Sequence, residues 1–473
     1  MRYLALATDY DGTLADGGGV AASTIEALEA LRKSSRFLIM VTGRLLEDLE
    51  SVFPHVELFD SIVAENGAIA YDPAKKERVV LAPAPPPELR NLLEARGVPL
   101  EGVGHVILAT REPHEKAMLD AIRELGLEMQ LIFNKGAVMA LPSGVNKATG
   151  LAAALATLKL SAHNTVGVGD GENDHAFLAF CECSAATANA VASLKERADI
   201  VLQLPNGAGV TALLATLLES DLRQVAPDRH RVPFATAGDA REILFDPYLQ
   251  GTLLFAGTSG GGKSTAALGL IERLMERDYQ VCIVDPEGDY EAFGNAIVLG
   301  DAATVPTIEE IAGVLDPPDR SAIVNLLGVE MHDRPGFVDE LLARLFASRA
   351  QYGRPHWIVL DEAHHLFPRE RSPAALLPRN VYSILAIAAE PQSLSPAFLE
   401  SVSSVVAFGN DAVRTIERAT GATLSGKIAD PQASQALLWQ SGAPKSAMLV
   451  EPLPPESTKR RHRRKYATGA LAP

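Results

Sequence analysis

The chain has few cysteines, and their spacing does not suit a disulfide framework or a zinc site. Its 473 residues include 3 Cys, which are Cys181, Cys183 and Cys282. An odd number of cysteines without a CxxC pair argues for a reducing compartment. We therefore interpret all three as small, buried hydrophobic residues.

Long apolar stretches and an excess of positive charge are also lacking. No apolar run approaches the roughly 20 residues that span a bilayer, and the first residues lack the apolar region and cleavage site of a signal peptide. The formal net charge of −16 disfavours broad binding to nucleic acid or to anionic membranes. We expect a cytoplasmic protein with no membrane partner, for which nucleic acid is a possible but not a favoured partner.

The length and composition indicate a globular protein with two or three domains, because 47% of the residues are hydrophobic and 22% are charged. Short apolar strands alternate with amphipathic helical patterns over residues 1–218, which predicts an α/β domain with a mostly parallel sheet. A smaller unit is inserted at about 83–142. The polar, charged and irregular segment 219–239 is the expected linker. A second α/β series covers 240–452, and a basic, flexible tail covers 453–473.

The first chemical motif comes directly after the first predicted strand. Asp9 and Asp11 stand two residues apart where that strand ends, so both carboxylates can point toward one side. One carboxylate can attack a phosphorus atom while the other handles the proton of the leaving group. Gly12 lets the chain turn sharply after them. Taken alone, the motif also fits a turn with two solvated acids.

Three further motifs follow in the same half of the chain. Thr42-Gly43-Arg44 ends the next strand and offers a hydroxyl and backbone N–H groups to phosphate oxygens. Lys147 opens a later helix and supplies a positive charge. Gly169-Asp170-Gly171-Glu172-Asn173-Asp174 follows a third strand and offers carboxylates to a hard cation such as Mg²⁺. Loops at one edge of a sheet are where α/β folds bind ligands, so the four motifs together predict phosphoryl transfer.

In this order, the four motifs resemble the haloacid dehalogenase superfamily, and within it the Cof-like and sucrose-phosphate-phosphatase-like phosphatases. The resemblance covers roughly residues 1–218 and implies a Rossmann-like core with a small α+β cap at about 83–142. Caps of this kind choose the substrate. The segment Ala64-Glu65-Asn66-Gly67-Ala68 is also typical of this branch, and we assign it no chemical role.

The same resemblance implies a role for each motif residue. Asp9 would be the nucleophile that becomes an aspartyl phosphate, and Asp11 would be the general acid and then the general base. Thr42 would bind the transferring phosphoryl group, and Lys147 would neutralise charge. Asn173 matches the metal loop of the family. The expected Mg²⁺ ligands are Asp9, Asp11, Asp170 and Asp174.

A second phosphate-binding motif follows the apolar strand at 253–256. It fits GxxxxGK[ST], in which glycines let backbone N–H groups surround phosphates at the start of a helix. Lys263 would reach the β- and γ-phosphates, and Ser264 would bind Mg²⁺. We therefore expect ATP and Mg²⁺ as cofactors. The nucleotide-binding residues are Gly257, Thr258, Ser259, Gly260, Gly261, Gly262, Lys263, Ser264 and Thr265.

A partner for this motif follows the apolar strand at 357–360. Asp361 and Glu362 come directly after that strand. Asp361 is suited to bind Mg²⁺, and Glu362 is suited to activate water. We interpret the next pair, His364 and His365, as packing residues at the strand exit, because metal-site spacing of the HEXXH type is absent.

This half resembles the HerA–FtsK superfamily of P-loop ATPases over roughly residues 235–450, which implies a RecA-like domain. Asp285-Pro286-Glu287-Gly288 matches the acidic turn of that group. Gln392 lies near a position that often senses the γ-phosphate. Arg414 or Arg418 would serve as an arginine finger if subunits formed a ring, so a homo-oligomer is possible; ordinary surface ion pairs are the simpler interpretation. Motor members usually carry an N-terminal β-barrel, so DNA translocation does not carry over directly.

The motifs are consistent with three functions. The leading hypothesis is a Mg²⁺-dependent phosphomonoester hydrolase, acting on a sugar phosphate or similar small metabolite, joined to an ATP-hydrolysing domain. The alternative is a nucleic-acid-processing protein that combines a motor with a terminal phosphatase. The basic run from Lys459 to Lys465 favours it, unless that run is only a solvated tail. A kinase–phosphatase pair ranks last, because Glu362 beside Asp361 favours water as the acceptor.

Overall fold

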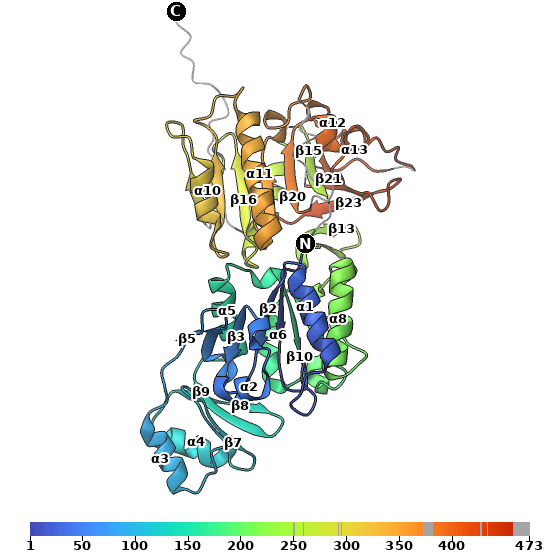
Figure 1. Ribbon diagram of the computed structural model, residues 1–473. Helices are drawn as coiled ribbons and strands as arrows, with labels where there is room; N and C mark the ends of the chain where they lie inside the picture. Colours follow the sequence, from blue (N-terminus) through green and yellow to red (C-terminus); the bar gives the residue numbers. More distant parts are fainter. Residues whose placement is uncertain are drawn as a thin grey trace, which may run out of the picture. The chain divides into compact units, whose positions relative to one another are not determined.

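The computed structural model divides the chain into two compact units, Met1–Asp228 and Arg229–Pro473, and we describe each by itself (Figure 1). Ser259 of the predicted P-loop and the basic run after residue 456 lie outside the described residues. The structure describes residues 1–248, 251–258, 260–291, 293–294, 296–371, 382–425, 428–432 and 434–456.

The first unit is built on an eight-stranded sheet in the order β12-β11-β10-β1-β2-β3-β4-β5. The strands from β12 to β3 are parallel, and β4 and β5 are antiparallel additions at one edge. Parallel strands covered on both faces are apolar throughout, and β1 is accordingly buried at every residue. The strands are β1 (Ala5–Thr8), β2 (Phe37–Val41), β3 (Ser61–Ala64), β4 (Ile69–Asp72), β5 (Glu77–Val80), β10 (Thr165–Gly169), β11 (Cys183–Ala186) and β12 (Ile200–Val201).

Helices cover both faces of this sheet. On one face α1 and α8 lie side by side (Figure 1), and they pack with α2 through an apolar cluster that includes Leu28, Leu49 and Leu213. On the other face α5, α6 and α7 form a second cluster that includes Leu151 and Phe177. The helices and short 3₁₀ turns are α1 (Ala22–Lys33), α2 (Leu46–Val52), η1 (Val56–Leu58), η2 (Glu65–Gly67), α5 (Lys147–Thr157), η3 (Ala162–Asn164), η4 (Glu172–Asp174), α6 (His175–Phe180), α7 (Ala192–Lys195) and α8 (Asn206–Ser220).

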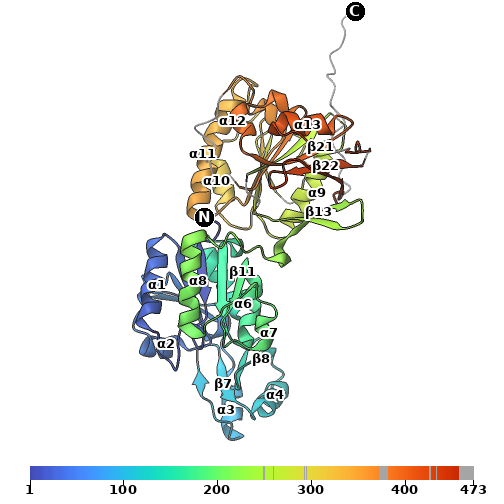
Figure 2. The same cartoon turned by 90° about the vertical axis from the view of Figure 1, so that its right-hand side faces the viewer.

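A small cap is inserted between β5 and α5 and has its own antiparallel sheet, in the order β6-β7-β9-β8. Two helices pack on this sheet through Leu89, Leu93, Met118 and Ile122, and Figure 2 shows the cap elements grouped at one end of the first unit. The cap therefore has a core separate from the two clusters of the large sheet. Its elements are α3 (Pro87–Ala95), β6 (Gly102–Val103), β7 (Leu108–Arg111), α4 (Glu115–Glu124), β8 (Met129–Asn134) and β9 (Ala137–Pro142).

The second unit has an eleven-stranded sheet in the order β14-β13-β23-β22-β21-β15-β20-β19-β16-β18-β17. The strands from β21 to β17 are parallel, and the others are antiparallel. The strands are β13 (Val232–Ala237), β14 (Glu242–Phe245), β15 (Thr252–Gly257), β16 (Val281–Asp285), β17 (Ile297–Leu299), β18 (Ala322–Asn325), β19 (Trp357–Leu360), β20 (Ile384–Ala388), β21 (Val402–Phe408), β22 (Ala436–Gln440) and β23 (Ala447–Pro452).

The helices of the second unit also lie on both faces of its sheet. One apolar cluster joins the sheet to α10, α11, α12 and α13, and another joins the opposite face to α9. Both units are therefore α/β structures, as the sequence predicted. None of the helices that the structure describes is long and apolar enough to cross a membrane. The helices and 3₁₀ turns are α9 (Lys263–Met275), α10 (Ile308–Leu315), α11 (Arg334–Tyr352), η6 (Ala363–His365), η7 (Pro391–Ser393), α12 (Pro396–Leu399) and α13 (Ala412–Thr420).

The segment 219–239, which we expected to be an irregular linker, contains regular structure. After the short turn η5 (Asp228–His230), the six residues Val232–Ala237 form β13, which pairs with β14 and β23. Val232 and Phe234 are buried in the core of the second unit. The irregular assignment was wrong for these residues, because the strand is short, its flanks are charged, and one of its two pairing partners, β23, lies far along the chain.

Candidate active sites

Three acids meet at the carboxyl ends of the central strands of the first unit. Asp9 follows β1, and Asp170 follows β10, which is the parallel neighbour of β1 with Thr8 opposite Val168. Asp174 lies four residues farther along the second loop. One carboxylate oxygen from each of Asp9, Asp170 and Asp174 lies within 4.8 Å of the other two, and all three residues are buried. The structure thus brings together three of the four predicted metal ligands.

Lys147 joins two of these acids, Asp9 and Asp174. It is the first residue of α5, where Asn146 caps the helix with its side chain. The Lys147 Nζ donates to Asp9 Oδ1 and to Asp174 Oδ1, each at 2.6 Å. The other oxygen of Asp174 accepts the backbone N–H groups of Asp170 and Gly171, each at 2.8 Å. Asp174 therefore shapes its own loop and also holds the buried lysine.

The electrostatics of the group favour a cation. Burial raises the pKa of Asp9, and the nearby Asp174 carboxylate raises it further, although Lys147 opposes the change. Burial also raises the pKa of Asp170, against the effect of Lys135. Burial alone would lower the pKa of Lys147, but Asp174 and Asp9 outweigh it and raise that pKa. Three buried carboxylates share two lysines, so an oxygen-seeking divalent cation such as Mg²⁺ fits this donor set.

Asp11 is placed differently from the prediction. Arg44 Nε lies 2.7 Å from Asp11 Oδ2, and Arg44 Nη2 lies 2.7 Å from Asp11 Oδ1. The same guanidinium also contacts Asp48 Oδ2 at 2.6 Å. The planar guanidinium matches both oxygens of one carboxylate, so the Asp11 carboxylate pairs with Arg44 and is not part of the three-acid group. This arrangement does not support the Asp11 side chain as a metal ligand.

Thr42 lies at the end of β2, the other parallel neighbour of β1, and is fully buried. Its Oγ1 accepts the backbone N–H of Arg44 at 3.1 Å. The hydroxyl therefore stabilises the turn that presents Arg44 to Asp11, at the same sheet edge as Asp9.

The cap supplies a residue that the sequence analysis missed. Lys135 forms the turn between β8 and β9; its Nζ donates to Asp170 Oδ2, and its backbone N–H donates to Glu172 Oε2 at 3.2 Å. Asn189 belongs to the part of the first unit outside the cap, which we call the large domain, and it donates to the same Asp170 oxygen at 3.0 Å. The sequence shows Lys135-Gly136 only as a turn between two short strands, so nothing in it points to the acids.

Three asparagine side chains close to the acids were also not foreseen as a set. Asn173 Nδ2 donates to Asn66 Oδ1 at 2.8 Å. Asn66 Nδ2, Asn134 Oδ1 and Asn173 Oδ1 are buried and have no hydrogen-bond partner among the described residues. A Cβ atom on Gly171 would lie 2.4 Å from Asn134 Oδ1 and 3.1 Å from Asn173 Oδ1. Buried polar atoms without a partner are costly, so they mark a place where a polar ligand can bind.

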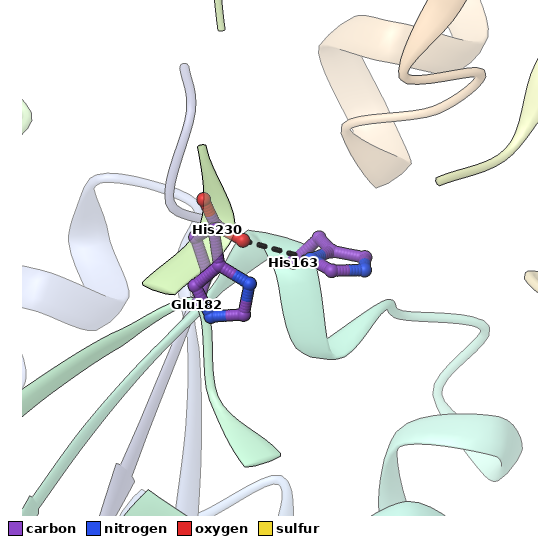
Figure 3. A group of neighbouring side chains, drawn as sticks. All are labelled: His163, Glu182 and His230. Atoms are coloured by element: carbon purple, nitrogen blue, oxygen red, sulfur yellow. Dashed lines mark hydrogen bonds and ion pairs between the residues drawn. The ribbon is translucent and has the colours of Figure 1, made fainter. Parts of the chain in front are cut away.

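A buried acid with a different character lies at the amino ends of the same strands. Glu182 precedes β11, and its Oε2 lies 2.7 Å from Nδ1 of His163, which precedes β10 (Figure 3). The other oxygen of Glu182 accepts Arg2 Nη2 at 2.9 Å. Both oxygens are engaged by side chains of the same unit, so we assign this pair a structural role.

In the second unit the P-loop residues connect β15 to α9. Lys263 Nζ donates to Gly257 O at 2.6 Å and to Thr258 O at 3.0 Å, so the lysine is held by its own loop. Gly257 has φ +138°, and a Cβ atom there would lie 2.2 Å from Phe408 O. Gly260, Gly261 and Gly262 complete the described part of the loop, and Ser264 and Thr265 follow in the first turn of α9.

The second acidic motif reaches the same edge of this sheet. Asp361 follows β19, and β20 separates β19 from β15. Glu362 has a left-handed φ of +41°, and its Oε2 lies 3.5 Å from His364 Nδ1. A left-handed conformation is strained for Glu, and such strain often marks a functional position.

Two glutamates that were not predicted as site residues, Glu287 and Glu390, act on the charge of His364. Burial lowers the pKa of His364, the charges of Glu287 and Glu390 oppose that change, and Lys263 adds to it. Glu287 belongs to the acidic turn after β16, and Glu390 belongs to the loop after β20.

The remaining predicted residues of this unit are Gln392, Arg414 and Arg418. Gln392 Nε2 donates to Glu390 Oε2 at 2.7 Å, and its buried Oε1 has no partner among the described residues. Arg414 lies 3.8 Å from Asp411 in an exposed pair, as in an ordinary surface contact. Arg418 lies in the last turn of α13.

Comparisons with known proteins match each unit separately. Residues 6–96 and 100–214 match the haloacid dehalogenase-like hydrolases, and residues 250–336 match the family described as helicase HerA, central domain. A phosphoglycolate phosphatase of Methanopyrus kandleri is 30% identical over 45% of this chain and 96% of its own length. One from Methanothermobacter thermautotrophicus is 28% identical over 44% of this chain and 95% of its own length. A solved haloacid dehalogenase-like hydrolase from Bacteroides thetaiotaomicron has 17% identity and a TM-score of 0.40, over 46% of this chain and 100% of that one.

Proposed function

We propose a function for this chain, which belongs to the haloacid dehalogenase-like hydrolases and also carries a HerA central domain. It is a Mg²⁺-dependent phosphomonoester hydrolase joined to an ATP-hydrolysing unit. The observation that carries the first activity is the buried group of Asp9, Asp170 and Asp174 around Lys147. Its carboxylates combine a nucleophile with a cation site. Asp9, Asp170 and Asp174 would hold Mg²⁺, which would neutralise charge on the phosphate.

The hydrolysis would follow two displacement steps. An oxygen of Asp9 attacks phosphorus, the bond to the ester oxygen breaks, and Asp11 gives a proton to the departing alcohol. Water then attacks the aspartyl phosphate, Asp11 takes a proton from that water, and orthophosphate leaves with Asp9 restored. Lys147 holds Asp9 Oδ1 at 2.6 Å, which fixes the orientation of the carboxylate. Because Arg44 holds both Asp11 oxygens, the pair must open or shift when the ester binds.

The substrate would be a small phosphate ester. The cap brings Lys135 and Asn134 to the acids, and the positive charge of Lys135 suits an anionic leaving group. The relatives named phosphoglycolate phosphatase make a phosphorylated hydroxy acid the first candidate, beside the sugar phosphates. A panel of phosphate esters assayed for phosphate release with Mg²⁺, and again after chelation, tests this proposal. Failure to hydrolyse any of them would refute it.

The second activity rests on the placement of Lys263, Asp361 and Glu362 at one edge of the sheet. Lys263 would bind the nucleotide phosphates, Asp361 would contact Mg²⁺, and Glu362 would orient the attacking water. The match to a helicase central domain keeps a nucleic-acid partner as the second candidate function. ATP hydrolysis that rises with added DNA or RNA, and falls with salt, would favour that candidate.

A further inference from the structure

The turn η2 connects β3 to β4, and nothing in the proposed reaction uses it. Its three residues all have left-handed backbones, with φ +49° at Glu65, +55° at Asn66 and +108° at Gly67. For residues with a side chain, this conformation is unfavourable. Such a turn persists only where surrounding contacts hold it, so those contacts indicate what the turn does.

The side chain of Glu65 contacts the cap. Glu65 Oε1 accepts the backbone N–H of His105 at 2.9 Å, and Oε2 accepts those of Val106 at 2.8 Å and Ile107 at 3.1 Å. These three residues form the turn between β6 and β7. The Glu65 side chain is 1% exposed. A carboxylate from the large domain is thus buried in a turn of the cap, where three successive N–H groups converge on it.

The cap is shaped to receive this carboxylate. A Cβ atom on Gly104 would lie only 2.5 Å from Glu65 Cδ and from Glu65 Oε2, so any side chain at that position would displace the carboxylate. Around it, Ala68 of the large domain is buried together with Val106, Ile107, Met139 and Leu141 of the cap. Glu65 therefore adds a polar anchor to an apolar junction between cap and large domain.

The same turn also contacts three loops of the candidate active site. Its backbone bonds the loop of Thr42, since Glu65 N donates to Arg44 O at 2.9 Å and Asn66 N donates to Thr42 O at 3.0 Å. The Asn66 side chain accepts from Asn173 at 2.8 Å. Gly67 approaches the start of α5 so closely that a Cβ atom there would lie 1.9 Å from Asn146 O, the residue before Lys147.

We propose that Glu65 is a positioning residue that holds the cap at a set distance from the three acids. Lys135 and Asn134 of the cap then stay in place at the reacting phosphate. This rests on the proposed phosphatase function, and it assigns the turn a role in turnover. A carboxylate suits the position because both of its oxygens accept hydrogen bonds, whereas an amide would place an NH₂ group against backbone N–H donors.

The first test measures the contact itself and needs no substrate. In Glu65→Ala, we expect the amides of His105, Val106 and Ile107 to exchange with solvent at least about tenfold faster, because charge-assisted bonds are lost. Glu101→Ala is the matched control: it removes an exposed cap carboxylate that pairs with Arg111 at 2.6 Å. Unchanged exchange in Glu65→Ala would overturn the proposal.

The second test asks whether the contact matters for turnover. For the ester that the wild-type protein hydrolyses best, we expect kcat to fall about 100-fold in Glu65→Ala and Glu65→Gln, with a smaller change in KM. The reason is that the cap groups that act in the transition state would be misplaced. ATP hydrolysis should stay unchanged. Wild-type kcat in both variants would overturn the role in turnover.

Gly104→Ala tests the same contact from the cap side. It should lower kcat as Glu65→Ala does, and the double variant should be no slower than the slower single variant, because both changes remove one interaction. Fully additive losses would overturn the proposal. Gly104→Ala also keeps the test open if Glu65→Ala fails to fold. A wild-type protein without esterase activity would refute the phosphatase function, and hydrogen exchange would then show separately whether Glu65 holds the cap.

Discussion

The two candidate sites lie at corresponding edges of two α/β sheets, but they are built from different parts of the chain. In the first unit the site consists of buried side chains, with Lys147 bonded to Asp9 and Asp174 at 2.6 Å. In the second unit the P-loop offers mainly backbone groups, and Lys263 donates to the loop carbonyls of Gly257 and Thr258. The first site therefore depends on the charge and identity of its side chains, and the second depends in addition on the backbone conformation of its loop.

The largest effect should come from the nucleophile of the first site. Asp9→Asn keeps the shape of the side chain but removes the attacking carboxylate, so esterase activity should fall by about 10⁴-fold or more. ATP hydrolysis should be unaffected. Asp16→Asn, an exposed change in the same loop, is the control. Full esterase activity in Asp9→Asn would refute the aspartyl-phosphate mechanism.

The second site should lose activity without any effect on the first. Lys263→Ala removes the charge that binds the nucleotide phosphates, and Glu362→Gln removes the group that orients water. Each should lower ATP hydrolysis by about 100- to 1000-fold, measured as phosphate released from ATP. Esterase activity that fell in parallel would show that the two activities are coupled and that the two sites are not independent.

The dependence of the second site on its backbone conformation can be tested by adding a methyl group to a glycine of the P-loop. Gly257→Ala adds a Cβ atom 2.2 Å from Phe408 O at φ +138°, so we expect a loss of at least about 2 kcal/mol in the unfolding free energy of that unit. Gly313→Ala is the matched control, since it lies exposed in α10 with open space around it. That change should stabilise the unit by about 0.5–1 kcal/mol. Equal changes in the unfolding free energy of the two variants would contradict a special requirement for glycine at position 257.

The smallest effect should come from the cap. Lys135→Ala removes a cation that reaches the acids, so KM for a small anionic ester should rise about tenfold. Lys116→Ala, an exposed lysine on α4 of the same cap, should leave KM unchanged. A normal KM in Lys135→Ala would mean that the cap does not read the charge of the leaving group.

Much of the arrangement could be predicted because both units follow one rule. Apolar strands that alternate with helices form parallel sheets, and the loops after such strands meet at one edge. The positions of Asp9, Asp170 and Asp361 directly after apolar runs therefore indicated where each site would lie. The α/β class of both units is confirmed, as is the family of the first unit; the chemical roles of the individual residues remain predictions.

Contacts between segments distant in the chain could not be predicted in this way. The bond from Arg44 to Asp11, the approach of Lys135 to Asp170, and the pairing of β13 with β23 all depend on where separate loops and strands meet. The local periodicity of hydrophobic residues carries no information on such contacts, because a turn such as Lys135-Gly136 has the same sequence pattern wherever its cap packs.

By itself, the sequence determined that two parallel-sheet units would present acids and phosphate-binding loops at strand ends, since hydrophobic alternation and loop chemistry are local properties. Only the tertiary structure decided that Glu65 would enter the cap, that Arg44 would hold Asp11, and that the cap would bring Lys135 to the acids. These contacts depend on the packing of the cap against the large domain, and that packing follows from the shapes of surfaces assembled from many segments.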